Sequence, residues 1–140
     1  MIENILLATD GSSPAQQAAE FAASLALRFR AKVTVLHAYT PVPAYWGEPN
    51  YSQIFYESLN GAKALAEDTA SRLHDMGVHQ VETEVIEGPA ANAILGVAET
   101  RRPDIIVIGA RGLSTWQGLL MGSVSMSVTQ RAECPVLVVK

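Results

Sequence analysis

The chain of 140 residues contains one cysteine, Cys134, so it cannot form a disulfide within itself. A protein without disulfides suits a reducing compartment. The opening residues, MIENILLATD, include an acidic side chain and lack the basic residues that begin a secretory signal. We therefore expect a cytoplasmic protein.

Long apolar runs and excess positive charge are also missing. No apolar stretch approaches the roughly 20 residues that a membrane helix requires, so we expect no membrane partner. The formal net charge is −4, whereas nucleic-acid binding favours a basic face, so we expect no nucleic-acid partner. Hydrophobic residues make up 49% of the chain and charged residues 17%, which favours a folded core over disorder. The length predicts one domain over residues 1–140.

Several catalytic and cofactor motifs are absent from the sequence. It has no G-x-S-x-G elbow, no H-E-x-x-H, no G-x-G-x-x-G and no G-x-x-x-x-G-K-[ST]. The three histidines share no metal-ligand spacing with each other or with Cys134. We expect His37, inside an apolar strand, to be a core histidine with a hydrogen-bond partner. No catalytic residue is assigned.

What the sequence does contain is a buried strand followed by spaced glycines. Residues 105–108, IIVI, are apolar on both faces, which is typical of a central strand in a parallel sheet. Gly109, Gly112 and Gly122-Ser123 follow with the spacing G-x2-G-x9-G-S. Glycine tolerates positive φ and lets backbone N–H groups approach a ligand closely. The alternative is that these glycines only make a tight turn.

A helix is expected at 124–132, directly after the last of these glycines. Ser123 suits the N-cap of such a helix. A helix start carries N–H groups without helical partners, and these favour an anion. Strand, glycines and helix start together predict a phosphate-binding site.

Gly109, Gly112, Gly122 and Ser123 resemble the nucleotide-binding signature of the universal stress protein family, in its ATP-binding type. The resemblance covers the whole chain. It includes the opening ILLATDGSSPAQQAAEFA, the strand VTVLHAY, the segment EGPAANAIL and the closing CPVLVVK. It implies a five-stranded parallel sheet in the order 3-2-1-4-5, a stress-response role, and binding of ATP, ADP or AMP.

Hydrophobic periodicity predicts strands that alternate with helices. The strands are expected at 2–8, 32–39, 78–87, from 105, and 134–140, and the helices at 14–30, 53–76, 90–102 and 124–132. This alternation implies an α/β fold of three layers, with helices on both faces of the sheet. A capping box at 13–16 is expected to begin the first helix. Its apolar face is expected to contain Ala18, Phe21, Ala22, Leu25 and Phe29.

In the implied strand order, the winding reverses between the first and fourth strands, and ligands bind such sheets at that point. We therefore expect a nucleotide site at Ala8, Thr9, Asp10, Ala38, Gly109, Arg111, Gly112, Gly122, Ser123, Val124 and Ser125. A carboxylate beside bare phosphate is repulsive, so Asp10 suits a ribose hydroxyl or an indirectly held Mg²⁺. The resemblance implies that main-chain groups at Ala38 hold adenine.

Phosphoryl transfer needs positioned positive charge, and the expected site offers one arginine, Arg111, and no evident general base. We therefore favour a binding and switching module in which ATP orders residues 113–121. The alternative is a slow Mg²⁺-dependent ATPase or an autophosphorylating protein. A third interpretation is a dimeric scaffold with an empty pocket. The downstream protein partner is unknown.

The last strand points to a homodimer. Val136–Val139 is apolar on both faces and lies at the edge of the implied sheet, where an open strand is a template for pairing. Two copies of this strand meeting antiparallel around a two-fold axis would cover each other. The family resemblance implies the same arrangement.

Overall fold

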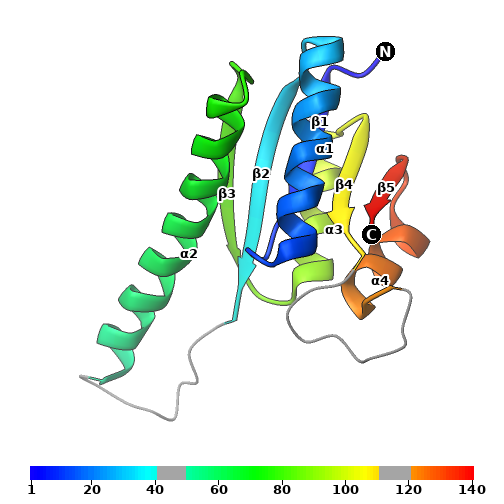
Figure 1. Ribbon diagram of the computed structural model, residues 1–140. Coiled ribbons are helices and arrows are strands. Elements are labelled where there is room, and N and C mark those ends of the chain that lie inside the picture. The colour runs from blue at the N-terminus through cyan, green and yellow to red at the C-terminus, as the bar shows by residue number, and fades with distance from the viewer. Residues whose placement is uncertain (41–49, 111–120) are drawn as a thin grey trace.

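Strands and helices alternate along the chain (Figure 1). The computed structural model describes residues 1–40, 50–110 and 121–140. The strands are β1 (Asn4–Ala8), β2 (Lys32–Tyr39), β3 (Val81–Glu87), β4 (Ile105–Gly109) and β5 (Val136–Val139). The helices are α1 (Ser13–Phe29), α2 (Asn50–Asp75), α3 (Ala90–Arg101) and α4 (Ser123–Arg131).

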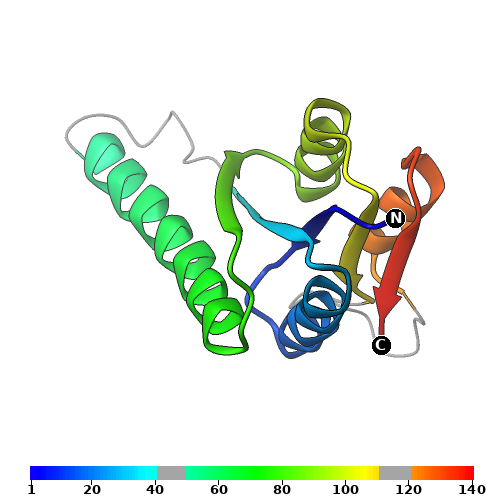
Figure 2. The same ribbon diagram turned by 90° about the horizontal axis from the view of Figure 1, so that it is seen from above.

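The five strands form one parallel sheet in the order β3-β2-β1-β4-β5, which confirms the predicted fold. Helices α1 and α2 cover one face, and α3 and α4 cover the other (Figure 2). In the central strand β1, Leu6 lies beside Thr34 of β2 and Ile106 of β4. The winding reverses between β1 and β4, so their carboxyl ends stand side by side with no crossover helix between them.

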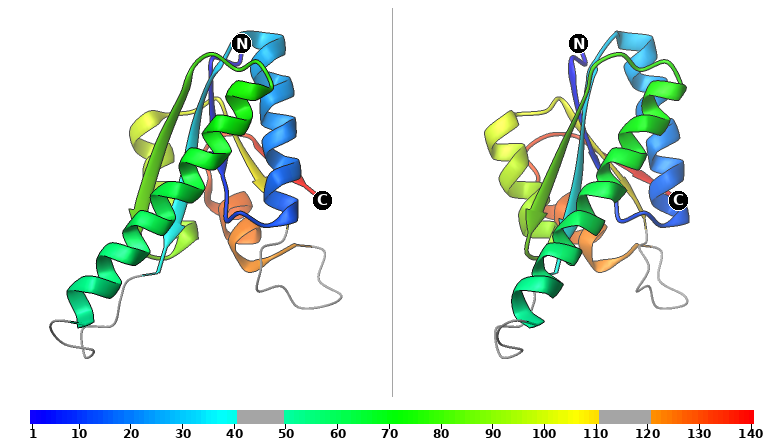
Figure 3. Two further views of the ribbon diagram at one scale, coloured as in Figure 1. Left: turned by 60° about the vertical axis from the view of Figure 1, so that its left-hand side comes forward. Right: turned by 90° about the vertical axis from the view of Figure 1, so that its left-hand side faces the viewer.

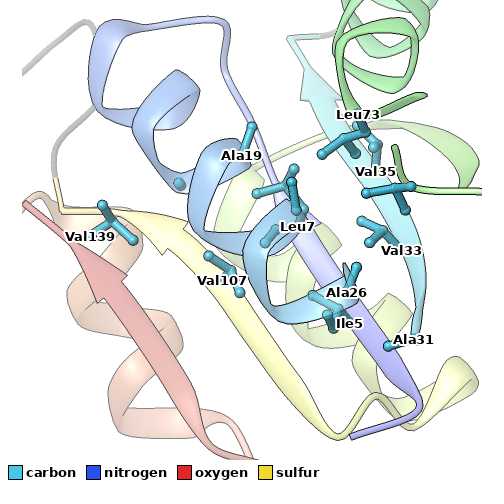
Figure 4. Close-up of a cluster of buried hydrophobic side chains, with 14 of the residues drawn as sticks. Ile5, Leu7, Ala19, Ala26, Ala31, Val33, Val35, Leu73, Val107 and Val139 are labelled. Carbon is cyan, nitrogen blue, oxygen red and sulfur yellow. The ribbon is translucent and has the colours of Figure 1, made fainter. Parts of the chain in front are cut away.

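The core has two halves, one on each face of the sheet. Ile5, Leu7 and Val107 belong to the half under α1 and α2 (Figure 4), and Leu6 and Ile106 belong to the half under α3 and α4. Alternate strand residues point to opposite faces, so each half draws on every second residue of the same strands. Fully buried strands of this kind explain the continuous apolar runs in the sequence.

Helix α1 lies against the sheet through alanines, and this corrects its predicted apolar face. Phe21 is 53% exposed and Phe29 is 41% exposed, although both were expected to face the core. The buried positions are Ala15, Ala18, Ala19, Ala22, Ala23 and Ala26. Small side chains let the helix lie close to the strands, so the largest apolar residues of α1 stay on its flanks.

Several element ends differ from the prediction. The N-cap of α1 is Ser12, whose hydroxyl accepts from the Ala15 N–H at 3.4 Å, and not the predicted box at 13–16. Helix α2 begins at Asn50, three residues earlier than expected, beyond the carboxyl end of β2, and runs back beside β2 and β3 (Figure 3). Within the described residues, no helix combines the length and apolarity needed to cross a bilayer.

Candidate functional site

A cavity of about 400 Å³ opens at the carboxyl ends of β1, β2 and β4. Nine of the eleven expected site residues line it: Ala8, Thr9, Asp10, Ala38, Gly109, Gly122, Ser123, Val124 and Ser125. Arg111 and Gly112 lie outside the described residues. The structure thus gathers residues from four distant segments into one cavity, and their role in nucleotide binding stays a prediction.

At the carboxyl end of β1, the cavity is lined by a tight turn that is held by hydrogen bonds between its own residues. The Gly11 N–H donates to the Thr9 hydroxyl at 3.2 Å, and the Ser12 N–H donates to the Asp10 carboxylate at 2.9 Å. Gly11 has φ +78°, a left-handed conformation that glycine adopts without steric cost. These bonds hold Asp10 at the cavity immediately before α1 begins.

His37 lies at the β2 side and is more than a core residue. Its Nδ1 contacts the Thr9 carbonyl oxygen at 2.9 Å, so Nδ1 must carry the proton and donate it. The predicted partner is therefore present, but the ring is only half-buried and the residue lines the cavity. Its position near the carboxyl end of β2 was the signal for this location.

Gly109, at the end of β4, is required by packing and not by a positive φ. A Cβ atom there would lie 2.9 Å from the Pro14 carbonyl carbon and 3.1 Å from the Ala15 nitrogen. Positive φ among the described glycines occurs at Gly11, Gly77 and Gly88. The glycine lets the first turn of α1 touch the end of β4, and this closes one wall of the cavity.

Helix α4 begins at the cavity, one residue earlier than predicted. Its N-cap is Gly122, with φ −75° and ψ 167°, so the expected cap Ser123 is instead the first helical residue. Gly122 has no side chain to cap the helix, and the first helical bond runs from the Met126 N–H to the Gly122 carbonyl. The N–H groups of the first turn therefore lack helical partners and are available at the cavity.

Eight further residues of the cavity lining, most of them apolar, were not predicted from the sequence. The additional lining residues are Ala15, Leu36, His37, Thr40, Ala90, Ile94, Ile108 and Ala110. Ala90 and Ile94 come from the first turns of α3. The sequence contained a signal for this position, because a helix that follows β3 starts at the carboxyl ends of the strands, where the glycines also lie.

The charge at the cavity is sparse. Asp10 is the one carboxylate among the described lining residues, and none of them is a lysine or an arginine. The described part of the chain holds no group of three metal-ligating side chains. A bound anion would therefore depend on the N–H groups at the start of α4, which lines the same cavity as Asp10.

Two carboxyl groups with lowered pKa values, those of Glu82 and Asp104, lie outside the lining of this cavity. A hydrogen bond from Arg101 lowers the pKa of Glu82 on β3. Backbone N–H groups of Glu3 and Asn4 donate to Asp104 at 2.7 and 2.9 Å and lower the pKa of that carboxyl. These pairs join elements of the fold and are not part of the candidate site.

Comparison with known proteins matches residues 1–140 to the universal stress protein family. A universal stress protein of Thermus aquaticus is 39% identical over 140 residues, with all of both chains aligned. The structure of the universal stress protein UspA from Lactobacillus plantarum superposes with a TM-score of 0.88 at 25% identity, covering 99% of this chain and 98% of that one. A universal stress protein solved in complex with cAMP has a TM-score of 0.77 at 26% identity, covering 99% and 97%. With its whole length, its sheet order and its relatives in agreement, the chain belongs to the universal stress protein family.

Proposed function

We propose that this protein binds an adenine nucleotide in the cavity between β1 and β4 and acts as a binding and switching module in a stress response. The observation that carries the proposal is that the start of α4, which has no side-chain cap, lines the same cavity as the carboxylate of Asp10. A similar protein of the family has been solved with cAMP. We favour ATP as the ligand, with ADP or AMP as the alternatives.

Each part of a nucleotide has a suitable group in the cavity. The phosphates suit the N–H groups of Ser123 and Val124 at the start of α4, with Gly109, Gly112, Gly122 and Arg111 beside them. A ribose hydroxyl suits the Asp10 carboxylate, because that group only accepts hydrogen bonds. Adenine suits the main chain at Ala38 beside the apolar surface of Leu36 and Ile94.

Mg²⁺ fits this site only together with a nucleotide. The ion is commonly held by one or two carboxylates, phosphate oxygens and water, and Asp10 offers a single carboxylate. Its chemistry here would be the neutralisation of phosphate charge. We therefore propose an indirect contact between Asp10 and Mg²⁺.

Nucleotide binding should stabilise the protein by mass action. With Mg²⁺ present, ATP at about a hundred times its dissociation constant is expected to add about 2.7 kcal/mol to the free energy of unfolding. Differential scanning fluorimetry with ATP, ADP, AMP and cAMP measures this as a rise in Tm. Adenosine is the control, since it cannot use the phosphate-binding end. The absence of any shift with all four nucleotides at millimolar concentration would refute the proposal.

The alternative is slow ATP hydrolysis or autophosphorylation. Its support is that Asp10 and His37 lie in the same cavity, but the described lining lacks a cation to stabilise a phosphoryl transition state. We expect Mg²⁺-ATP bound to the wild type to stay largely intact over hours, with no phosphate transferred to the protein. Chromatography of the bound nucleotide and mass spectrometry of the chain measure both. Repeated turnover within minutes that is lost in Asp10→Asn would favour the enzyme instead.

We further propose a homodimer through Val136–Val139. The Ala110 N–H donates to the Val139 carbonyl at 2.7 Å and the Ile106 N–H donates to the Pro135 carbonyl at 2.9 Å. The backbone groups of Pro135 and Val139 therefore face β4. Backbone groups alternate in direction along a strand, so those of Val136 and Val138 face the open edge. Among the described strands, β5 has a partner on one side only. A second copy of β5, antiparallel to the first, would satisfy these groups.

A further inference from the structure

The end of β4 and the start of α4 meet at one buried peptide group, that of Ala110. Ala110 is 2% exposed. Its N–H donates to the Val139 carbonyl of β5, and its carbonyl accepts from the Gly122 N–H at 2.5 Å and the Ser125 hydroxyl at 2.7 Å. Two hydrogen bonds from the helix start, within the described residues, therefore meet at this carbonyl and attach α4 to the end of β4.

The hydroxyl of Ser125 is committed to this attachment. Ser125 is 2% exposed, and its Oγ lies 2.7 Å from the Ala110 carbonyl and 3.0 Å from the Gly122 carbonyl. A serine hydroxyl has one proton, and both neighbours can only accept it. A phosphate oxygen at neutral pH also needs a donor, so Ser125 would have to leave the protein carbonyls to serve it.

The Ser125 hydroxyl makes one local and one long-range hydrogen bond. The contact with Gly122 is a local bond to the carbonyl three residues earlier, which serines make in many helices. The contact with Ala110 is shorter and spans 15 positions in the chain. It fixes α4 relative to β4, and the geometry of the helix alone does not require it.

We propose that Ser125 is a positioning residue of the nucleotide site and not a direct contact of the phosphates. Through the Ala110 carbonyl it holds the first turn of α4 against the end of β4, so that the N–H groups of this turn stay aimed at the cavity. The inference rests on the proposed nucleotide binding. It gives Ser125, one of the expected site residues, an indirect role at the site.

Substitution of Ser125 should loosen this attachment without unfolding the protein. In Ser125→Ala the Ala110 carbonyl keeps the Gly122 N–H as a donor, so no buried group loses every partner. We expect amide exchange of Gly122 in the nucleotide-free protein to accelerate, and the affinity for AMP to fall, each by roughly three- to tenfold, as suits the loss of one hydrogen bond. Ser125→Thr keeps the hydroxyl and should restore both values.

Hydrogen exchange followed by NMR and isothermal titration calorimetry with AMP make the measurements. Ser123→Ala is the matched control, because Ser123 is exposed in the same helical turn and its loss leaves the Ala110 attachment intact. It should leave the Gly122 exchange rate at the wild-type value. If Ser125→Ala does not fold, Ser125→Cys replaces it, since a thiol donates only weakly.

The outcomes separate this inference from the proposed function. Unchanged Gly122 exchange in nucleotide-free Ser125→Ala, together with weaker AMP binding, would show a direct contact and overturn the inference. Faster exchange with unchanged AMP affinity would also overturn it. Both of these results require that the wild type binds AMP. If the wild type binds neither AMP nor ATP, the proposed function fails, and the positioning role fails with it.

Discussion

Replacing Gly109 with alanine is expected to destabilise the protein by about 1–3 kcal/mol, the usual cost of overpacking a close contact. The added Cβ would lie 2.9 Å from the carbonyl carbon of Pro14, a distance at which the backbone must shift. The nearest atoms belong to the first turn of α1, so they cannot turn away as a flexible side chain would. Urea unfolding of the wild type and the variant measures the difference.

The same substitution should also weaken nucleotide binding. A displaced α1 moves Ser12 and Asp10, because the Ser12 N–H is bonded to the Asp10 carboxylate immediately before the helix. We expect the Tm rise with Mg²⁺-ATP to shrink or disappear in Gly109→Ala. The effect does not require a contact between Gly109 and the ligand.

Gly96→Ala provides the matched control for this prediction. Gly96 lies inside α3, and a Cβ there would meet nothing within 4 Å. The same chemical change should therefore stabilise the helix by roughly 0.5–1 kcal/mol, since alanine loses less backbone entropy on folding. If the two substitutions had equal effects, the close approach of α1 to Gly109 would not limit that position.

Val138→Pro is expected to dissociate the proposed homodimer while leaving the subunit folded. Proline removes the N–H that faces the open edge of β5 and keeps the groups that pair with β4, and edge strands tolerate it. A two-fold interface loses this bond twice. At the usual net worth of a hydrogen bond, the dimer dissociation constant should rise roughly tenfold to a hundredfold.

Sedimentation velocity over a range of concentrations tests the assembly, and circular dichroism monitors the fold. Leu137→Pro is the control, because the Leu137 N–H faces β4 and its loss should destabilise the subunit itself. A wild type that is monomeric at micromolar concentration would contradict the proposed dimer. A Val138→Pro protein that dimerises as tightly as the wild type would place the contact elsewhere.

The order of elements was determined by the sequence alone, because hydrophobic period is a local property. The run at 105–108 predicted a buried strand, and β4 is found there between β1 and β5. The glycine and serine spacing also predicted a ligand site at the carboxyl ends of the strands, where a cavity is found beside Gly109, Gly122 and Ser123. The resemblance to a known family supplied the strand order itself.

Tertiary structure alone decided what each of these residues does. Gly109 is small because α1, distant in the chain, lies against it, and no local pattern reports such an approach. Phe21 is 53% exposed because the buried face of α1 consists of alanines, whereas periodicity cannot tell a tight interface from a wide one. Ser125 was expected at the nucleotide site, and the fold brings the Ala110 carbonyl within 2.7 Å of its hydroxyl. Local sequence shows which residues can form a site, while contacts between distant segments decide which of them reach the ligand and which hold the others in place.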